Sequence, residues 1–192
     1  MTVARFARVW RPGAGLLLAL GAAVAMPSPA RGQDIGAVAP DFSAPYVADS
    51  AAAPWHFWAR DAMPVTILSF WATWCRPCET LHPWLEALAR SYAPSGVRVV
   101  TINMREPADS IRRLLAADTG SVTLDVLDPD GHITQLYSVT SVPTTLMVGE
   151  SNVVLRRWEG VAAVMGGMET VVRRLVGPES TASATRSRGC SE

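Results

Sequence analysis

Residues 65–72, Val-Thr-Ile-Leu-Ser-Phe-Trp-Ala, are apolar with hardly any polar alternation, and they lead directly into a pair of cysteines, Cys75 and Cys78. A run of this kind is typical of a strand that is buried on both faces of a sheet, so other elements must cover it from above and below. After the cysteines, apolar residues recur at helical spacing as far as the breakers Pro94 and Gly96. We therefore expect a helix of roughly 16 residues with one apolar face.

The rest of the chain alternates strand and helix patterns. Strands are expected at 97–102 and 122–127, helices around 111–115, 133–137 and 163–176, a hairpin at 144–148 and 153–158, and a short strand within 41–47. This order predicts an α/β fold in which a central mixed sheet is flanked by helices, because the hairpin adds antiparallel strands to parallel ones. Residues 33–64 are expected to form an N-terminal extension that packs on this core.

The two ends of the chain carry different signals. Residues 1–32 resemble an export signal, with Arg5, Arg8 and Arg11 before an apolar stretch at 14–26 and a small-residue site at 30–32. The stretch is shorter than the roughly 20 residues of a membrane span. We expect cleavage to leave a domain at 33–178, with an uncleaved N-terminal anchor as the alternative. Residues 179–192 are expected to be a disordered tail in which Cys190 has no role.

Charge and cysteine content narrow the functional classes. Of the 17 arginines, four lie in residues 1–32, where no acidic residue occurs, so a cleaved chain would carry 13 arginines against 17 acidic residues. This balance gives no basic surface for nucleic acid. Export predicts the periplasm, or another extracytoplasmic side of a bacterial envelope, as the location. Disulfides persist there, but two cysteines are too few for a disulfide scaffold.

The spacing of Cys75 and Cys78 allows several chemistries. Haem attachment needs histidine after the second cysteine, where Glu79 stands, and structural zinc needs four ligands, although His82 could share a helix face with Cys78. We expect His82 to be a helix-surface residue. A crosslink over so short a loop stabilises little. At a strand-to-helix junction, however, the N–H groups of the first turn and Arg76 would favour a thiolate, so we expect Cys75 to be an exposed nucleophile and Cys78 the less exposed resolving thiol.

Several segments together resemble one known family. They are "FWATWCRPC" at 70–78, "IGAVAPDF" at 35–42, "VTINM" at 100–104, "LDPDGHITQLYSVTSVPTT" at 127–145, and Gly160. This set resembles the TlpA/ResA branch of the thioredoxin-like proteins, which are exported thiol-disulfide oxidoreductases linked to cytochrome maturation. The resemblance implies a thioredoxin-like fold with an extra strand-helix unit at about 97–118.

The resemblance also implies roles for single residues. Val142-Pro143 would be a cis peptide beside the disulfide, where its backbone pairs with a bound substrate chain, and Trp71 and Trp74 would flank the site. Trp74, Arg76, Pro77 and Val142 would contact the substrate. No cofactor beyond the Cys75–Cys78 disulfide is implied.

Two positions depart from the family pattern. Ser69 stands where thioredoxin has a buried aspartate, and Leu81 stands where the branch often has a glutamate, so both familiar proton acceptors for the resolving thiol are missing. Glu106 follows a predicted strand, and in open α/β sheets function gathers at the carboxyl ends of strands. We hypothesise that Glu106 accepts the Cys78 proton; the alternative is a solvated loop carboxylate.

The family implies a protein that reduces disulfides of partner proteins, such as apocytochrome c or a copper-centre assembly factor, and that is recharged by an electron donor in the membrane. We expect it to be a monomer. The residues themselves do not fix the direction, since known CxxC proteins range from about −270 to about −120 mV. A disulfide oxidant, a copper(I) chaperone and a docking module without turnover stay open as alternatives, because soft thiolates also suit copper(I).

Overall fold

The computed structural model describes residues 34–49, 51–58, 63–115 and 120–177. The predicted export signal and the whole of the predicted tail, with Cys190, lie outside the described residues. None of the helices within the described ranges is both long enough and apolar enough to cross a membrane.

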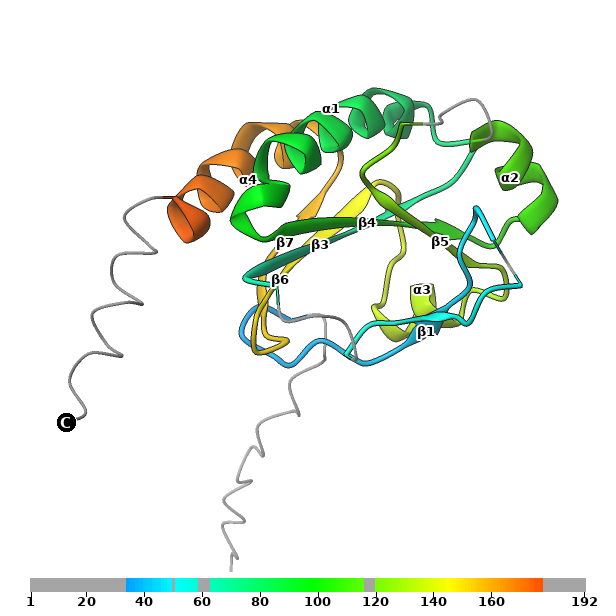
Figure 1. Cartoon of the computed structure of the whole chain (residues 1–192), viewed down its shortest axis with the longest axis horizontal. Helices are drawn as coiled ribbons and strands as arrows, with labels where there is room; N and C mark the ends of the chain where they lie inside the picture. The colour runs from blue at the N-terminus through cyan, green and yellow to red at the C-terminus, as the bar shows by residue number, and fades with distance from the viewer. Residues whose placement is uncertain (1–33, 50, 59–62, 116–119, 178–192) are drawn as a thin grey trace, which may run out of the picture.

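A five-stranded mixed sheet forms the centre of the structure (Figure 1), with strand order β5-β4-β3-β6-β7. The strands are β3 (Val65–Trp71), β4 (Val97–Met104), β5 (Leu124–Asp128), β6 (Thr144–Gly149) and β7 (Val154–Glu159). β4 runs parallel to β3 and to β5, whereas β6 runs antiparallel to β3 and to β7. The predicted mixed sheet and hairpin are therefore present. The strand of the predicted extra unit, β4, lies inside the sheet, and β5 forms its edge.

Helices and loops cover the two faces of the sheet differently. α1 (Arg76–Tyr92) and α4 (Val161–Val176) lie on one face, and α3 (His132–Leu136) lies on the other with the N-terminal segment (Figure 1). α2 (Ala108–Leu115) follows β4. Val65 and Ile67 of β3 pack in the α1/α4 core, whereas Leu68 and Phe70 pack in the opposite core. Burial on both faces explains why the β3 sequence does not alternate.

The N-terminal segment packs on the core through aromatic rings. Its two strands, β1 (Ser43–Ala44) and β2 (Trp55–His56), have two residues each and pair with each other. Phe42 stacks on Phe57 with ring centroids 5.1 Å apart and meets Tyr137 edge-on at 5.8 Å. The Tyr137 hydroxyl donates a hydrogen bond to the Pro40 carbonyl at 2.6 Å. This segment therefore covers part of the sheet face on which α3 lies.

Candidate active site

Cys75 and Cys78 form a disulfide at the start of α1, directly beyond the carboxyl end of β3. Cys75 is the residue that caps the helix, and its sulfur accepts a hydrogen bond from the Cys78 backbone N–H at 3.2 Å. Its own N–H donates to the Ala72 carbonyl at 3.0 Å, which fixes the turn between strand and helix. Because the first N–H groups of a helix have no partner within it, this position stabilises negative charge on the Cys75 sulfur.

The disulfide lines a mainly apolar cavity of about 330 Å³. Its walls are Trp71, Ala72, Thr73, Cys75, Cys78, Glu79, His82, Leu114 and Leu115. The two leucines come from α2, so the helix that follows β4 supplies the wall opposite α1.

The predicted exposure of Cys75 is wrong for this oxidised state, since Cys75 is only 3% exposed and Cys78 only 2%. The disulfide joins both sulfurs, and Trp71 packs in the same buried cluster. By contrast, Trp74 is 68% exposed beside them, and Arg76 and Pro77 are exposed as well. The most accessible apolar group next to the disulfide is therefore the Trp74 ring.

The Val142–Pro143 peptide bond is cis. Val142 is half-buried and packs against the cluster that contains both cysteines, and Pro143 is buried. The Pro143 carbonyl accepts a hydrogen bond from Gly160 N–H at 2.8 Å, which ties this loop to the end of β7. The structure thus brings the 142–143 peptide to the cysteines, although it is 64 residues away from Cys78 in the sequence.

Glu106 reaches the active-site loop, residues 72–75 between β3 and α1, but its carboxylate accepts hydrogen bonds from groups other than the thiols. Its Oε2 accepts hydrogen bonds from Thr73 N–H at 2.7 Å and from the Asn103 side-chain amide at 2.7 Å, and its Oε1 accepts one from the Thr73 hydroxyl. Thr73 lies two residues before Cys75, so Glu106 holds the loop that carries Cys75. Glu106 is not simply a solvated carboxylate, and its predicted role as a proton acceptor for Cys78 stays a prediction.

Ser69 and Leu81, the two departures from the family pattern, have structural roles. The Ser69 hydroxyl lies 3.2 Å from the Thr145 hydroxyl in the interior of the sheet. Leu81 is 1% exposed in the core between α1 and α4. Neither side chain can accept a proton from a thiol in the physiological range. In the same region Trp71 Nε1 and Asn103 Oδ1 are buried with no hydrogen-bond partner among the described residues.

The prediction that His82 is a surface residue is wrong. His82 is half-buried and packs edge-on against Trp71, with ring centroids 4.4 Å apart. Burial lowers the pKa of His82 below its ordinary value. The four-residue spacing from Cys78 is visible in the sequence. The contact with Trp71 and the nearby α2 leucines depend on the tertiary fold and could not be predicted from it.

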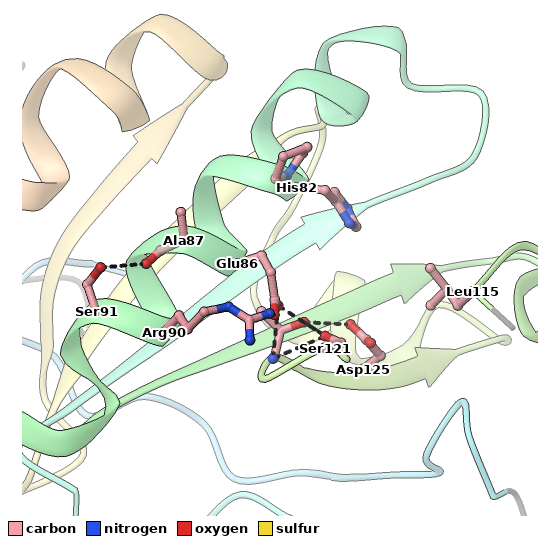
Figure 2. Close-up of a pocket in the computed structure, with 10 residues that line it drawn as sticks. His82, Glu86, Ala87, Arg90, Ser91, Leu115, Ser121 and Asp125 are labelled. Atoms are coloured by element: carbon pink, nitrogen blue, oxygen red, sulfur yellow. Dashed lines mark hydrogen bonds and ion pairs between the residues drawn. The ribbon is translucent and has the colours of Figure 1, made fainter. Parts of the chain in front are cut away.

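A second, more open cavity of about 630 Å³ adjoins the first, because His82 and Leu115 line both. In Figure 2, His82 and Glu86 extend from α1 toward the side on which Leu115 and Asp125 lie. Glu86 accepts hydrogen bonds from Val122 N–H at 2.8 Å and from the Ser121 hydroxyl at 3.1 Å, and it pairs with Arg90 at 2.6 Å. This carboxylate links α1 to the segment before β5.

Within the described ranges, no group of three or more histidine, cysteine or acidic side chains is arranged to hold a metal ion. The thiols are joined to each other in this structure.

Comparison with curated proteins gives relatives that match part of the chain. The thioredoxin-like protein YneN of Bacillus subtilis is 37% identical over 89 residues, which cover 46% of this chain and 52% of YneN. The thiol-disulfide oxidoreductase ResA of Geobacillus kaustophilus is 32% identical over 84 residues, 44% of this chain and 48% of ResA. The chain spans about half the length of the curated relatives it matches.

Solved structures match more of the chain. A protein described as a thiol:disulfide interchange protein DsbE from Chlorobium tepidum has a TM-score of 0.66 and 27% identity, and the match covers 75% of this chain and 99% of that one. StoA from Bacillus subtilis has a TM-score of 0.56 and 19% identity over 69% of this chain and 96% of StoA, which shows the fold alone. These matches confirm the predicted thioredoxin-like fold and the resemblance to the TlpA/ResA branch.

A family model agrees with this assignment over most of the described structure. The AhpC/TSA family model matches residues 35–157, from the N-terminal segment through the cysteines, the cis-proline loop and most of β7. Since this match covers well over half of the chain, the protein belongs to the AhpC/TSA family.

Proposed function

We propose that this protein is an exported thiol-disulfide oxidoreductase in which Cys75 and Cys78 exchange two electrons with disulfides of partner proteins. The observation that carries the proposal is the Cys75 sulfur at the start of α1, which accepts the Cys78 N–H and lines an open cavity. A sulfur in this position is a better nucleophile near neutral pH than an ordinary thiol, because the helix terminus stabilises its thiolate. The names of ResA and of the DsbE-like protein describe the same class of reaction.

The proposed reaction starts from the reduced protein. The Cys75 thiolate attacks one sulfur of the partner's disulfide, so that a bond forms between Cys75 and the partner while the partner's other sulfur leaves as a thiolate. Cys78 then attacks the Cys75 sulfur and displaces the reduced partner. The protein is left with the disulfide seen here, and an electron donor in the membrane would reduce it again.

Residues around the cysteines would position the partner. We propose that the exposed Trp74 ring, with Arg76, Pro77 and the half-buried Val142, contacts the partner chain. The 142–143 backbone would pair with the extended partner segment next to its disulfide, with Pro143 fixing the loop. Glu106 would position the nucleophile through Thr73. No organic cofactor or metal takes part in these steps.

The proposed direction is reduction of partner disulfides during cytochrome c maturation or copper-centre assembly, by a monomer on the extracytoplasmic side of the envelope. Support for this direction comes from the resemblance to the TlpA/ResA branch. The proposed partners are proteins. The net acidic charge of the chain after residue 32 argues against a nucleic-acid partner.

The first experiment tests turnover against metal holding. The reduced protein is assayed for insulin reduction with a dithiol as electron source, and is titrated in parallel with copper(I). Turnover without stoichiometric copper supports the proposal, and tight stoichiometric copper binding without turnover contradicts it. The Cys78→Ser variant, which stalls the mixed disulfide, would then identify the partner by mass spectrometry of the trapped complex.

A further inference from the structure

Cys78 and His82 lie one helical turn apart on the same side of α1. Side chains four residues apart on a helix are neighbours. Both residues line the cavity at the disulfide, with Trp71 and the leucines of α2 as its apolar walls. The imidazole is therefore a titratable group that lines the same mainly apolar cavity as Cys78.

Trp71 holds the His82 ring in place by edge-on packing at 4.4 Å. Burial lowers the pKa of His82, so the imidazole is neutral at pH 7 and has a free lone pair. A neutral imidazole can accept a proton from a thiol, whereas an imidazolium cannot.

His82 also borders both cavities, since it lines the disulfide cavity and the larger one. The other titratable or charged groups that face these cavities are Cys75, Cys78 and Glu79 in the first, and Glu86, Arg90 and Asp125 in the second. α2 contributes only Leu114 and Leu115, which do not titrate. A proton on His82 can therefore pass to water in the larger cavity without crossing the apolar wall.

We propose that His82 accepts the proton of the Cys78 thiol as Cys78 attacks the mixed disulfide, and then releases it to solvent through the larger cavity. This proposal rests on the proposed oxidoreductase function. In the step, the Cys78 S–H bond breaks and its proton moves to the imidazole. A bond forms between the Cys78 and Cys75 sulfurs, and the bond between Cys75 and the partner sulfur breaks. The partner leaves as a thiolate with the electron pair and takes up a proton from water.

The competing carboxylates are less well placed. Glu79 is exposed and directly follows Cys78, and adjacent helical residues do not face each other. Glu106 already accepts hydrogen bonds from Thr73 and Asn103. His82 is the group that shares both a helix face and a cavity with Cys78.

The test separates the two chemical steps in one stopped-flow experiment. The reduced protein, in a Cys190→Ser background, is mixed with the chromogenic disulfide DTNB. Attack by Cys75 releases one coloured thiolate, and the later attack by Cys78 releases the second. His82→Gln should slow the second phase about 100-fold at pH 7, the scale of general base catalysis, and leave the first phase within about twofold.

The pH profile distinguishes a base from a merely structural residue. In the wild type the rate of the second phase should rise with pH up to the lowered pKa of His82 and stay constant above it, so the plateau should begin below the ordinary histidine pKa of about 6.5. In His82→Gln it should rise about tenfold per pH unit, since deprotonation then depends on hydroxide. Added imidazole should restore the second phase in His82→Ala. The matched variant His132→Gln, an exposed histidine on α3, should behave as the wild type.

Three results would overturn the proposal. They are a second phase in His82→Gln equal to that of the wild type, a uniform slowing with an unchanged pH profile and no rescue by imidazole, or the loss appearing in Glu79→Gln or Glu106→Gln instead. A wild-type protein that shows neither phase contradicts the oxidoreductase function itself. A wild type with both phases and an unaffected His82→Gln contradicts only the role of His82.

Discussion

At the scale of single residues, the active-site loop is held by a side chain from another strand's end. Thr73 presents both its N–H and its hydroxyl to the Glu106 carboxylate, and Asn103 donates to the same group. A carboxylate that accepts several hydrogen bonds is a strong tether, because charge-assisted bonds are stronger than neutral ones. Thr73 precedes Cys75 by two residues, so this tether helps to set the position of Cys75.

Glu106→Gln should therefore lower the free energy of unfolding by about 1 to 2 kcal/mol. The glutamine amide places an NH₂ group where a carboxylate oxygen accepted hydrogen bonds, so one or more of these bonds is lost. Urea unfolding of the oxidised protein measures this loss. The matched variant Glu150→Gln changes an exposed carboxylate in the β6–β7 turn and should stay within about 0.5 kcal/mol of the wild type. Equal stability of the two variants would show that Glu106 does not tether the loop.

At the scale of elements, α1 is connected to the sheet edge by a carboxylate as well as by its apolar face. Glu86 accepts hydrogen bonds from the backbone at 122 and 123 and from Ser121, and it is paired with Arg90. Burial alone would raise the pKa of Glu86, but these hydrogen bonds and the arginine outweigh it and bring the pKa below its ordinary value.

This pKa direction predicts how stability depends on pH. A carboxylate whose folded-state pKa is lowered stabilises the protein above its unfolded-state value and loses that contribution as the pH falls through the folded-state value. Glu86→Gln should therefore be less stable than the wild type at pH 7 by about 1 kcal/mol. The difference should shrink as the pH falls below the ordinary glutamate pKa of 4.5 and close below the lowered folded-state pKa. Urea unfolding from pH 7 to pH 3 measures it. A difference that stays constant over this range would contradict the assignment.

The helices and strands could be predicted from local sequence patterns, whereas the geometry of the site depends on tertiary packing. The apolar run at 65–72 and the helical spacing after Cys78 predicted β3 and α1. Burial of both strand faces, or of one helix face, produces a pattern of apolar residues that is visible in the local sequence. The proximity of Glu106 to the active-site loop was also expected from its place after a strand. The burial of Cys75 and of His82 was not expected, since it depends on packing against Trp71 and on α2, which comes from a later part of the chain.

At the scale of the whole molecule, two apolar cores sandwich the sheet, and the N-terminal segment builds one of them. Phe57 is 0% exposed in contact with Phe42 and Trp55. The segment is thus part of the folded unit and not an appendage. The carboxyl ends of β3 and β4, where the site lies, are supported from both faces.

Phe57→Ala should accordingly cost about 3 to 5 kcal/mol of global stability, as for other large buried aromatic side chains. Trp58→Ala is the matched control, because Trp58 is 46% exposed although its indole donates to the Ala39 carbonyl at 3.1 Å. Thermal or urea unfolding followed by the far-ultraviolet signal of the sheet measures both. If Phe57→Ala only loosened the N-terminal segment and left the unfolding of the sheet unchanged, the segment would be a separate unit.

The direction of electron flow is also a property of the whole molecule, because the reduction potential of Cys75–Cys78 is linked to the stabilities of the two redox forms. A protein that is a strong oxidant has a reduced form that is stabilised by folding. For the proposed reductant we expect the opposite order, with the oxidised form unfolding at higher urea than the reduced form in a Cys190→Ser background. Every 1.4 kcal/mol of difference corresponds to about 30 mV in the two-electron potential relative to the unfolded chain. A reduced form that is more stable than the oxidised form would instead assign this protein to the disulfide oxidants. In that case the stabilisation of the Cys75 thiolate at the start of α1 would exceed the stabilisation that the disulfide gives to the folded protein.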